Sequence, residues 1–496
     1  MPARKTSSVA LLQWVIVLVV GIVVVALVLG LNLITRLSDG QKVINAAKPA
    51  FTTQSLNTDV AGINILSDDV QLADPIVTPA GGGAAEVPTI VGFVAAADHI
   101  SDAQALAALQ KGFPHTTALL QSIPLSAVTA EVPHLEAFLE TALKVTPAQL
   151  VAALQANFPA ILQTITYLPD VTNNWYNIPG LAAVGFTDFN GTPVRSVPQL
   201  RTYFKDDLIP AVAAQKKNFD SLTKTTVNWI PWVILIIGIV VIVFSLLMIL
   251  RNLRGIGRIE AIASASVVVV VGLVVIVFVL ALGLIPRLSA TQRLIKGLNP
   301  AFTVSRVKGD RIGINEVSDI INFENPVMTP SGGAAAEVPK LIAFVSSKTG
   351  LAPTAVVGAL QKNFPHTLAV LEAIPLTSVS AELPSVVGAL TPAAVPKIPR
   401  LAQTVLFAPP VTNGWNDVPG TAGATNFEGG PVNTVPEIGT YFSHDVIPVL
   451  EKQRRDWVTL TATSRVAFLG PLVLIIGIIA FVYGLLMVAL AKTRAP

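Results

Sequence analysis

The chain has 496 residues, a net charge of +3, and 52 % hydrophobic but only 13 % charged residues. Soluble domains carry about 25 % charged residues, so this composition and a mean hydropathy of +0.65 predict an integral membrane protein. The absence of cysteine excludes a disulfide framework and a thiolate metal site.

Four apolar runs are long enough to cross a bilayer, which takes about 20 helical residues, and none has a charged residue or His in its interior. In chain order we predict a cytoplasmic N-terminus (1–10), a transmembrane helix (11–34), an extracytoplasmic helical domain (35–229), a second transmembrane helix (230–250), a cytoplasmic loop (251–261), a third transmembrane helix (262–285), a second extracytoplasmic helical domain (286–465), a fourth transmembrane helix (466–490) and a cytoplasmic tail (491–496).

Charge on the short flanks gives the orientation. The N-terminus, the middle loop and the tail hold Arg4, Lys5, Arg251, Arg254, Arg258, Lys492 and Arg494, against the single acid Glu260. By the positive-inside rule these pieces face the cytoplasm. We therefore expect a multi-pass protein of the plasma (inner) membrane, with both termini cytoplasmic and both large domains outside.

The sequence also indicates an internal tandem repeat of one unit. The sequence "PAFT" at 49–52 recurs at 300–303, "AAEVP" at 84–88 recurs at 335–339, and "VTNNW" at 171–175 recurs as "VTNGW" at 411–415. Because each unit holds two spans, both copies have the same orientation, and we expect a parallel tandem repeat about an axis along the membrane normal.

Periodicity predicts a mostly α fold for the outer domains. Ser101 is a predicted N-cap for a helix to Phe113, and Pro114 starts the next helix, 114–123. Helical stalks are expected at 37–47 and 208–228, loops at 78–88 and 329–339, and a small β-hairpin in 53–78 as a minor strand component.

A helix corner recurs as "ALQKGFPHT" (108–116), "ALQANFPAI" (153–161) and "ALQKNFPHT" (359–367). We interpret the shared frame A-L-Q-x-x-F-P as structural: a helix end, an apolar side chain and a Pro-started helix. Its repeated positions are Leu109, Gln110, Phe113, Pro114, Leu154, Gln155, Phe158, Pro159, Leu360, Gln361, Phe364 and Pro365. The Lys and His of two copies, Lys111, His115, Lys362 and His366, are candidate surface or ligand residues.

Catalytic and cofactor motifs are not evident, and we expect no enzyme, metal or cofactor. The Gly run at 81–83 lacks the Lys of a phosphate-binding loop, no G-x-S-x-G is present, and the five histidines form no ligand pair. We interpret the duplicated acids (Asp68/Asp319, Glu86/Glu337, Glu131/Glu382, Asp207/Asp445) as caps, turns and solvated faces. We interpret the duplicated aromatics (Trp175/Trp415, Tyr203/Tyr441, Phe204/Phe442) as core residues, with a lipid or ligand groove as the alternative.

Three function classes remain. The first is a non-enzymatic accessory or scaffold subunit of a cell-envelope complex, the second an oligomeric transporter or channel for hydrophobic cargo, and the third an extracytoplasmic sensor that relays through a partner. The Ala/Val/Pro-rich, Cys-free composition is similar to that of actinobacterial (mycobacterial-type) membrane proteins. The span–outer domain–span unit resembles accessory proteins of envelope lipid transport, a resemblance that assigns no residue roles. Expected partners are the bilayer and other membrane or envelope proteins, not nucleic acid; the sequence leaves the oligomeric state open.

Overall fold

The computed structural model describes residues 8–78, 82–224, 228–254, 257–330, 332–389, 395–461 and 466–493. The charged residues Arg4, Lys5 and Arg494, used above for orientation, and Gly81 lie outside these ranges. The described chain is mostly α-helical, and its only extended pairings are two isolated bridges, Thr187 with Pro193 and Thr425 with Pro431. The predicted mostly α class is therefore confirmed.

Contacts divide the chain into two compact units, one formed by 1–51, 211–303 and 452–496 and the other by 52–210 and 304–451. The helices of the first unit are α1 (Ser8–Gly30), α2 (Leu33–Ala47), α12 (Lys216–Thr223), α13 (Ile230–Leu253), α14 (Arg258–Ala281), α15 (Leu284–Leu298) and α24 (Leu469–Lys492), with a short 3₁₀ turn η5 (Val466–Phe468). Helices α11 (Ile209–Ala214) and α23 (Ile447–Thr461) each begin in the second unit and continue into the first.

Four helices of the first unit are long and apolar enough to cross a membrane: Leu11–Gly30, Ile230–Leu253, Arg258–Ala281 and Leu469–Lys492. A bent pair in the second unit, Ala334–Thr349 and Pro353–Asn363, also passes the hydropathy test, but its two helices meet at 103°. Most of each apolar run found in the sequence thus lies in one long helix.

The first and third of these helices end earlier than the apolar run in the sequence. Helix α1 stops at Gly30, and Asn32 adopts a left-handed conformation (φ 50°) before α2 begins. Gly283 (φ 56°) makes the matching break between α14 and α15. A left-handed residue cannot continue a right-handed helix, so the helix is interrupted at both places.

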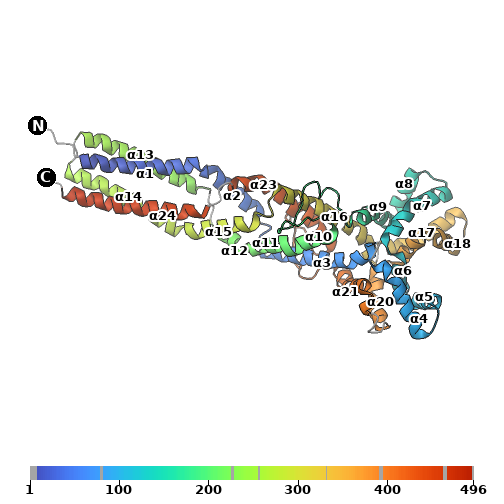
Figure 1. The fold of residues 1–496 in the computed structure, drawn as a ribbon. Helices are drawn as coiled ribbons and strands as arrows, with labels where there is room; N and C mark the ends of the chain where they lie inside the picture. Colours follow the sequence, from blue (N-terminus) through green and yellow to red (C-terminus); the bar gives the residue numbers. More distant parts are fainter. Residues whose placement is uncertain are drawn as a thin grey trace. The chain divides into compact units, whose positions relative to one another are not determined.

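The spans pack as two helix pairs, α1 with α13 and α14 with α24 (Figure 1). Glycines allow the second pair to approach closely. A Cβ atom built on Gly272 would lie 2.4 Å from the backbone nitrogen of Phe481, and one on Gly484 would lie 2.7 Å from that of Val269. Without side chains at these positions the backbones gain van der Waals contact, which drives helix association in lipid.

Where the structure describes them, the predicted stalks are mostly helical: α2 covers 37–47, and α11 and α12 cover most of 208–224. Residues 225–227 of the second stalk lie outside the described ranges. Within the first unit, α12 packs on α15, the rings of Phe51 and Phe219 stack with centroids 4.2 Å apart, and the rings of Phe302 and Trp457 stack at 4.3 Å. Stacked aromatic pairs contribute beyond their buried area. These contacts tie the segments that flank the spans to one another.

The second unit contains the remaining helices: α3 (Thr53–Val77), α4 (Val87–Asp98), α5 (Asp102–Gly112), α6 (Pro114–Ser122), α7 (Leu125–Leu143), α8 (Pro147–Asn157), α9 (Pro159–Asn174), α10 (Val197–Thr202), α16 (Val304–Met328), α17 (Ala334–Thr349), α18 (Pro353–Asn363), α19 (Pro365–Ala373), α20 (Leu376–Ala389), α21 (Pro399–Gly414) and α22 (Val435–Thr440). Its shorter elements are 3₁₀ turns η1 (Gly83–Ala85) and η3 (Val395–Lys397) and π-helical turns η2 (Tyr203–Leu208) and η4 (Tyr441–Val446).

Helices of the two sequence halves interleave in this unit. Helix α3 packs on α21, α16 packs on α9, and α6 packs on α19, so that each of these contacts joins one half to the other. The core between them includes Trp175 and Trp415, both fully buried, and Tyr203 and Tyr441, each 1 % exposed. The duplicated aromatics are therefore core residues, as predicted.

Two local predictions are wrong. The expected hairpin in 53–78 is helix α3, which begins at the N-cap Thr52, whose side chain accepts a hydrogen bond from the Ser55 amide. Its β-branched residues, such as Ile63 and Ile65, are buried among other helices, and this packing outweighs their strand propensity. The expected loop at 329–339 is also too long, because α17 begins at Ala334.

Candidate functional site

The predicted helix corners exist and share one backbone conformation. Phe113, Phe158 and Phe364 each end one helix and precede the proline that starts the next, with φ/ψ of −139°/65°, −140°/53° and −139°/55°. Ser101 and Thr146 form capping boxes at the starts of α5 and α8. A fourth corner lies at Ile398, with φ/ψ of −128°/51°. Sequence reasoning missed it because Ile replaces Phe there.

Each corner binds a glutamate from the opposite half of the chain. The Glu382 carboxylate accepts hydrogen bonds from the amides of His115 (3.3 Å) and Thr116 (2.8 Å) at the start of α6. Glu131 accepts the same two bonds from His366 (3.2 Å) and Thr367 (2.8 Å) at the start of α19. A carboxylate at this position satisfies amides without a helical partner and opposes the helix dipole.

The other two corners repeat the arrangement. Glu337 accepts hydrogen bonds from the amides of Ala160 (3.2 Å) and Ile161 (2.9 Å) at the start of α9. Glu86 accepts them from Arg400 (3.1 Å) and Leu401 (2.8 Å) at the start of α21. The duplicated glutamates are therefore caps, as predicted, but each caps a helix of the other half.

The sequence carries a signal for these four glutamates. Each lies in an A-E-[V/L]-P motif, at 85–88, 130–133, 336–339 and 381–384. Within the first half, the two A-E-V-P motifs begin 45 residues apart, at 85 and 130, and the two F-P corners are also 45 residues apart, at 113 and 158. Glutamate motifs and corners thus occur in equal number, although sequence alone does not say which glutamate meets which corner.

The lysines and histidines singled out in the sequence have different surroundings. Nδ1 of His115 donates a hydrogen bond to the Glu372 carbonyl (2.9 Å), and Nδ1 of His366 donates one to the Gln121 carbonyl (2.9 Å). Each histidine thus links α6 and α19 across the two halves. Lys111 and Lys362 are exposed, and neither makes an ion pair with any residue that the structure describes.

The frame residues have distinct positions at the corners. Leu109, Leu154, Phe158 and Phe364 are buried, Phe113 and Leu360 are half-buried, and Gln110, Gln155, Gln361, Pro114, Pro159 and Pro365 are exposed. The apolar positions therefore pack into the unit, while the glutamines face solvent. Two further duplicated acids close loops, because Asp207 accepts a hydrogen bond from the Phe189 amide and Asp445 one from the Phe427 amide, both at 3.0 Å.

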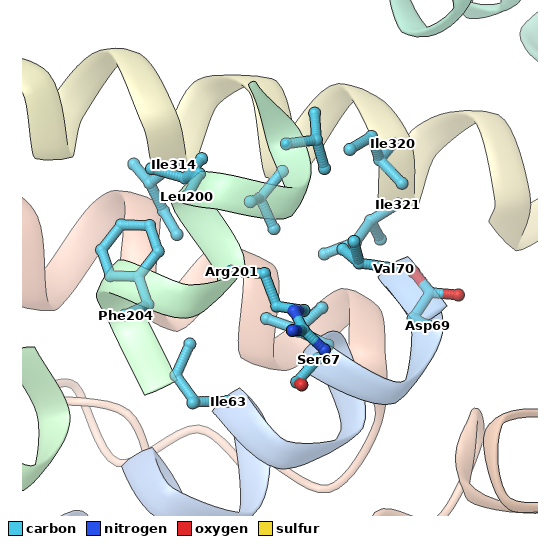
Figure 2. Close-up of a pocket in the computed structure, with 13 residues that line it drawn as sticks. Ile63, Ser67, Asp69, Val70, Leu200, Arg201, Phe204, Ile314, Ile320 and Ile321 are labelled. Carbon is cyan, nitrogen blue, oxygen red and sulfur yellow. The ribbon is translucent and has the colours of Figure 1, made fainter. Parts of the chain in front are cut away.

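A cavity lies within the second unit, lined by α3, α10, the start of η2, and α16 (Figure 2). Its volume is about 30 Å³, room for one or two water molecules. Most of its walls are aliphatic, and the walls from α3 and α16 are residues at matched positions of the two halves: Ile63 and Ile314, Leu66 and Val317, Val70 and Ile321. Phe204, one of the duplicated aromatics, also lines it.

Polar residues of the cavity come from the first half. Arg201, Ser67 and Asp69 line it (Figure 2), whereas the positions matched to Arg201 and Asp69 in the second half are Gly439 and Ile320. Lys205 donates a hydrogen bond to the Ser67 hydroxyl (3.2 Å). The matched positions have therefore diverged in charge at this cavity.

Carboxyl groups are buried beside the cavity. Asp69 on α3 and Glu324 on α16 interact and are 2 % and 5 % exposed. Burial raises the pKa of both groups, and the neighbouring Asp69 raises the pKa of Glu324 further. Burial disfavours the charged form of a carboxyl, so this pair retains a proton to higher pH than a solvated pair.

A second set of buried acids consists of Asp59 on α3 and Asp310 on α16, at matched positions of the two halves. Burial raises the pKa of Asp59 to about 7 and that of Asp310 to about 8, against the opposing influence of the neighbouring Tyr441 and Tyr203 hydroxyls. The sequence comparison missed this duplicated pair, although both positions are Asp at the same offset as "PAFT".

The described residues contain no group of three or more His, Cys, Asp or Glu side chains that could hold a metal ion. Comparison of the chain with models of protein families, with curated proteins and with solved structures finds no match.

Proposed function

We propose that this protein is a non-enzymatic integral membrane protein that acts as an accessory or scaffold subunit of a cell-envelope complex, with lipid transport as the process it serves. The observation that carries the proposal is the set of four glutamate caps between the halves. These bonds use repeated polar residues to hold helices of the two halves together. Such an interlocked body suits a protein that presents a fixed surface to partners.

The four apolar helices support the same role. The four spans are apolar helices without charged residues in their interiors, whereas coupled transport and ion permeation use ionisable groups inside the membrane. Glycines at close approaches, such as Gly272 in α14 and Gly238 in α13, favour helix packing. In this proposal the spans anchor the protein and the second unit meets its partners outside the membrane.

Co-purification from the native host tests the proposal. The tagged chain is extracted in a mild detergent, and co-purifying proteins are identified and quantified by mass spectrometry. We expect a membrane transporter or synthase in stoichiometric amount. A charge reversal that opens one corner, Glu382→Lys, is expected to release it, whereas Glu136→Lys, on the exposed face of α7, retains it. A homo-oligomer with bound lipid and no partner protein would contradict the scaffold role.

Single cysteines test the proposed orientation, because the native chain has none. With a membrane-impermeant maleimide on intact spheroplasts, Ser101→Cys is expected to react at once and Arg254→Cys only after permeabilisation. The reverse pattern would refute the assignment of the second unit to the outer face and of the α13–α14 connection to the cytoplasm.

A further inference from the structure

Basic side chains gather at one end of the four spans, on helices of the first unit that include α2, α12 and α15 (Figure 1). The segments that lead to or from this end are 31–51, 211–224, 284–303 and 452–461. They hold twelve Lys or Arg residues and three Asp residues, a net charge of +9. Because the whole chain carries only +3, the rest of it is net negative. The Lys and Arg residues of these four segments are called the basic cluster below.

Four pairs of positions in the cluster match between the two sequence halves and are basic in both. They are Arg36/Arg287 and Lys42/Arg293 at an offset of 251 residues, and Lys216/Arg454 and Lys217/Arg455 at an offset of 238. The stacked rings Phe51/Phe219 and Phe302/Trp457 occupy matched positions at the same two offsets. Both halves therefore bring cations to the same end of the spans, whereas the charged positions at the cavity differ between the halves.

The cluster faces solvent and has few acids to balance its charge. Eight of its twelve side chains are exposed and four are half-buried. Asp39 forms an ion pair with Lys42 (2.8 Å) and Asp220 forms one with Lys216 (2.6 Å), and Asp456 is the third acid of the segments. Since three acids can offset three cations at most, the cluster keeps a large excess of positive charge.

Aromatic side chains mark the level of the membrane surface beside the cluster. Trp232, in the first turn of α13, is 52 % exposed, and Trp at the end of a span is typical of the headgroup level. The ring of Trp229 packs on that of Phe278 in α14, with centroids 5.7 Å apart, so α13 begins near the level at which α14 ends. Arg36 and Arg287 each follow the end of a span by six residues, about 9 Å at the helical rise. That distance is close to the Debye length of about 8 Å at physiological ionic strength.

We propose that the basic cluster binds anionic phospholipid headgroups at this end of the spans. One Lys or Arg near an anionic membrane surface favours binding about fivefold. A lipid surface fits the cluster better than an acidic protein does, because a chain anchored by four spans already holds these cations beside the headgroups. The proposal requires that the spans cross a membrane and needs no partner protein, so its failure would leave the scaffold role intact.

Quenching of Trp232 fluorescence by brominated lipid tests the proposal with the full-length chain in nanodiscs. The bilayer is phosphatidylcholine with a minor fraction of bromo-acyl phosphatidylglycerol or bromo-acyl phosphatidylcholine in both leaflets, so the result does not depend on the orientation of the chain. The signal of Trp232 is the difference between the native chain and Trp232→Phe. At low salt we expect the anionic quencher to be enriched at Trp232 about fivefold over the zwitterionic one. The enrichment should disappear at about 1 M salt, where the Debye length is about 3 Å. Equal quenching by the two lipids at low salt would overturn the proposal.

Two double variants locate the charge. Lys224→Gln with Arg287→Gln neutralises cations that lie six residues from the end of a span, and we expect it to lower the enrichment toward that of the zwitterionic lipid. Lys144→Gln with Lys340→Gln removes the same charge from exposed positions of the second unit and should keep the native enrichment. Unfolding temperatures in detergent show whether both variants fold, and the salt dependence of the native chain tests the proposal without them. Equal enrichment in the two folded variants would refute the role of the basic cluster.

Discussion

The cap that Glu382 supplies to α6 offers the sharpest test of the interlocked fold. Its carboxylate accepts bonds from the amides of His115 and Thr116 and from the Thr116 hydroxyl, the latter two at 2.8 Å. Because Thr116 lies in the first turn of α6, its amide has no helical acceptor. In Glu382→Gln the side chain keeps its length but has one acceptor oxygen and no charge.

The magnitude follows from these contacts. Hydrogen bonds to a charged group contribute about 1.5–3 kcal/mol each, and a carboxylate at a helix N-terminus adds about 0.3–1 kcal/mol. Since the amide side chain keeps one acceptor, we expect Glu382→Gln to cost about 2 kcal/mol of local stability. That figure corresponds to about 30-fold faster hydrogen exchange.

Hydrogen–deuterium exchange of the full-length protein, read at the peptide that contains Thr116, measures this effect. The sequence-matched variant Glu131→Gln is expected to act equally on Thr367 at the start of α19. Glu136→Gln, on the exposed face of α7, is the control and leaves both sites unchanged. Unaltered protection of Thr116 in Glu382→Gln would refute the reasoning, because no other acceptor in the described chain accounts for it.

Two other perturbations test the membrane pair and the buried acids. Gly272→Ala places a methyl group at 2.4 Å from the Phe481 nitrogen, and we expect it to weaken the packing of α14 on α24 by about 1–3 kcal/mol. The measurement is the unfolding temperature in detergent, which should fall. Gly30→Ala, with open space around it, is the control, and an equal fall in both variants would argue against close packing at Gly272. Burial raises the pKa of Asp310 from 3.8 to about 8, so the folded state binds more protons than the unfolded state and stability falls as pH rises through this range, by about 4 kcal/mol between pH 4 and 7. Asp310→Asn introduces a neutral side chain of the same shape and should flatten the dependence of the unfolding free energy on pH. The exposed Asp206→Asn should not. An unchanged pH dependence in Asp310→Asn would show that Asp310 does not cause it.

Local features were predictable where the sequence itself contains the whole interaction. Ser101 with Gln104 and Thr146 with Gln149 form capping boxes within four residues, and the F-P corners fix their own backbone. The hairpin expected in 53–78 failed for the opposite reason. Helix α3 draws its stability from burial of residues such as Leu66 and Leu72 against other helices, and short β-branched runs give no sign of that environment.

By itself, then, the sequence determined the apolar spans, the recurring motifs and the helix corners, because hydropathy, residue identity and capping are properties of neighbours along the chain. Only the tertiary structure decided that each corner receives its glutamate from the other half, that Asp59 and Asp310 are buried, and that Arg201 and Asp69 line one cavity. The physical reason is that a carboxylate can cap any free helix start within reach, and helix packing selects the one it meets. The Lys and His of the repeated corner illustrate the difference: the sequence showed that they recur, and the fold showed that the histidines bridge α6 and α19 while the lysines face solvent.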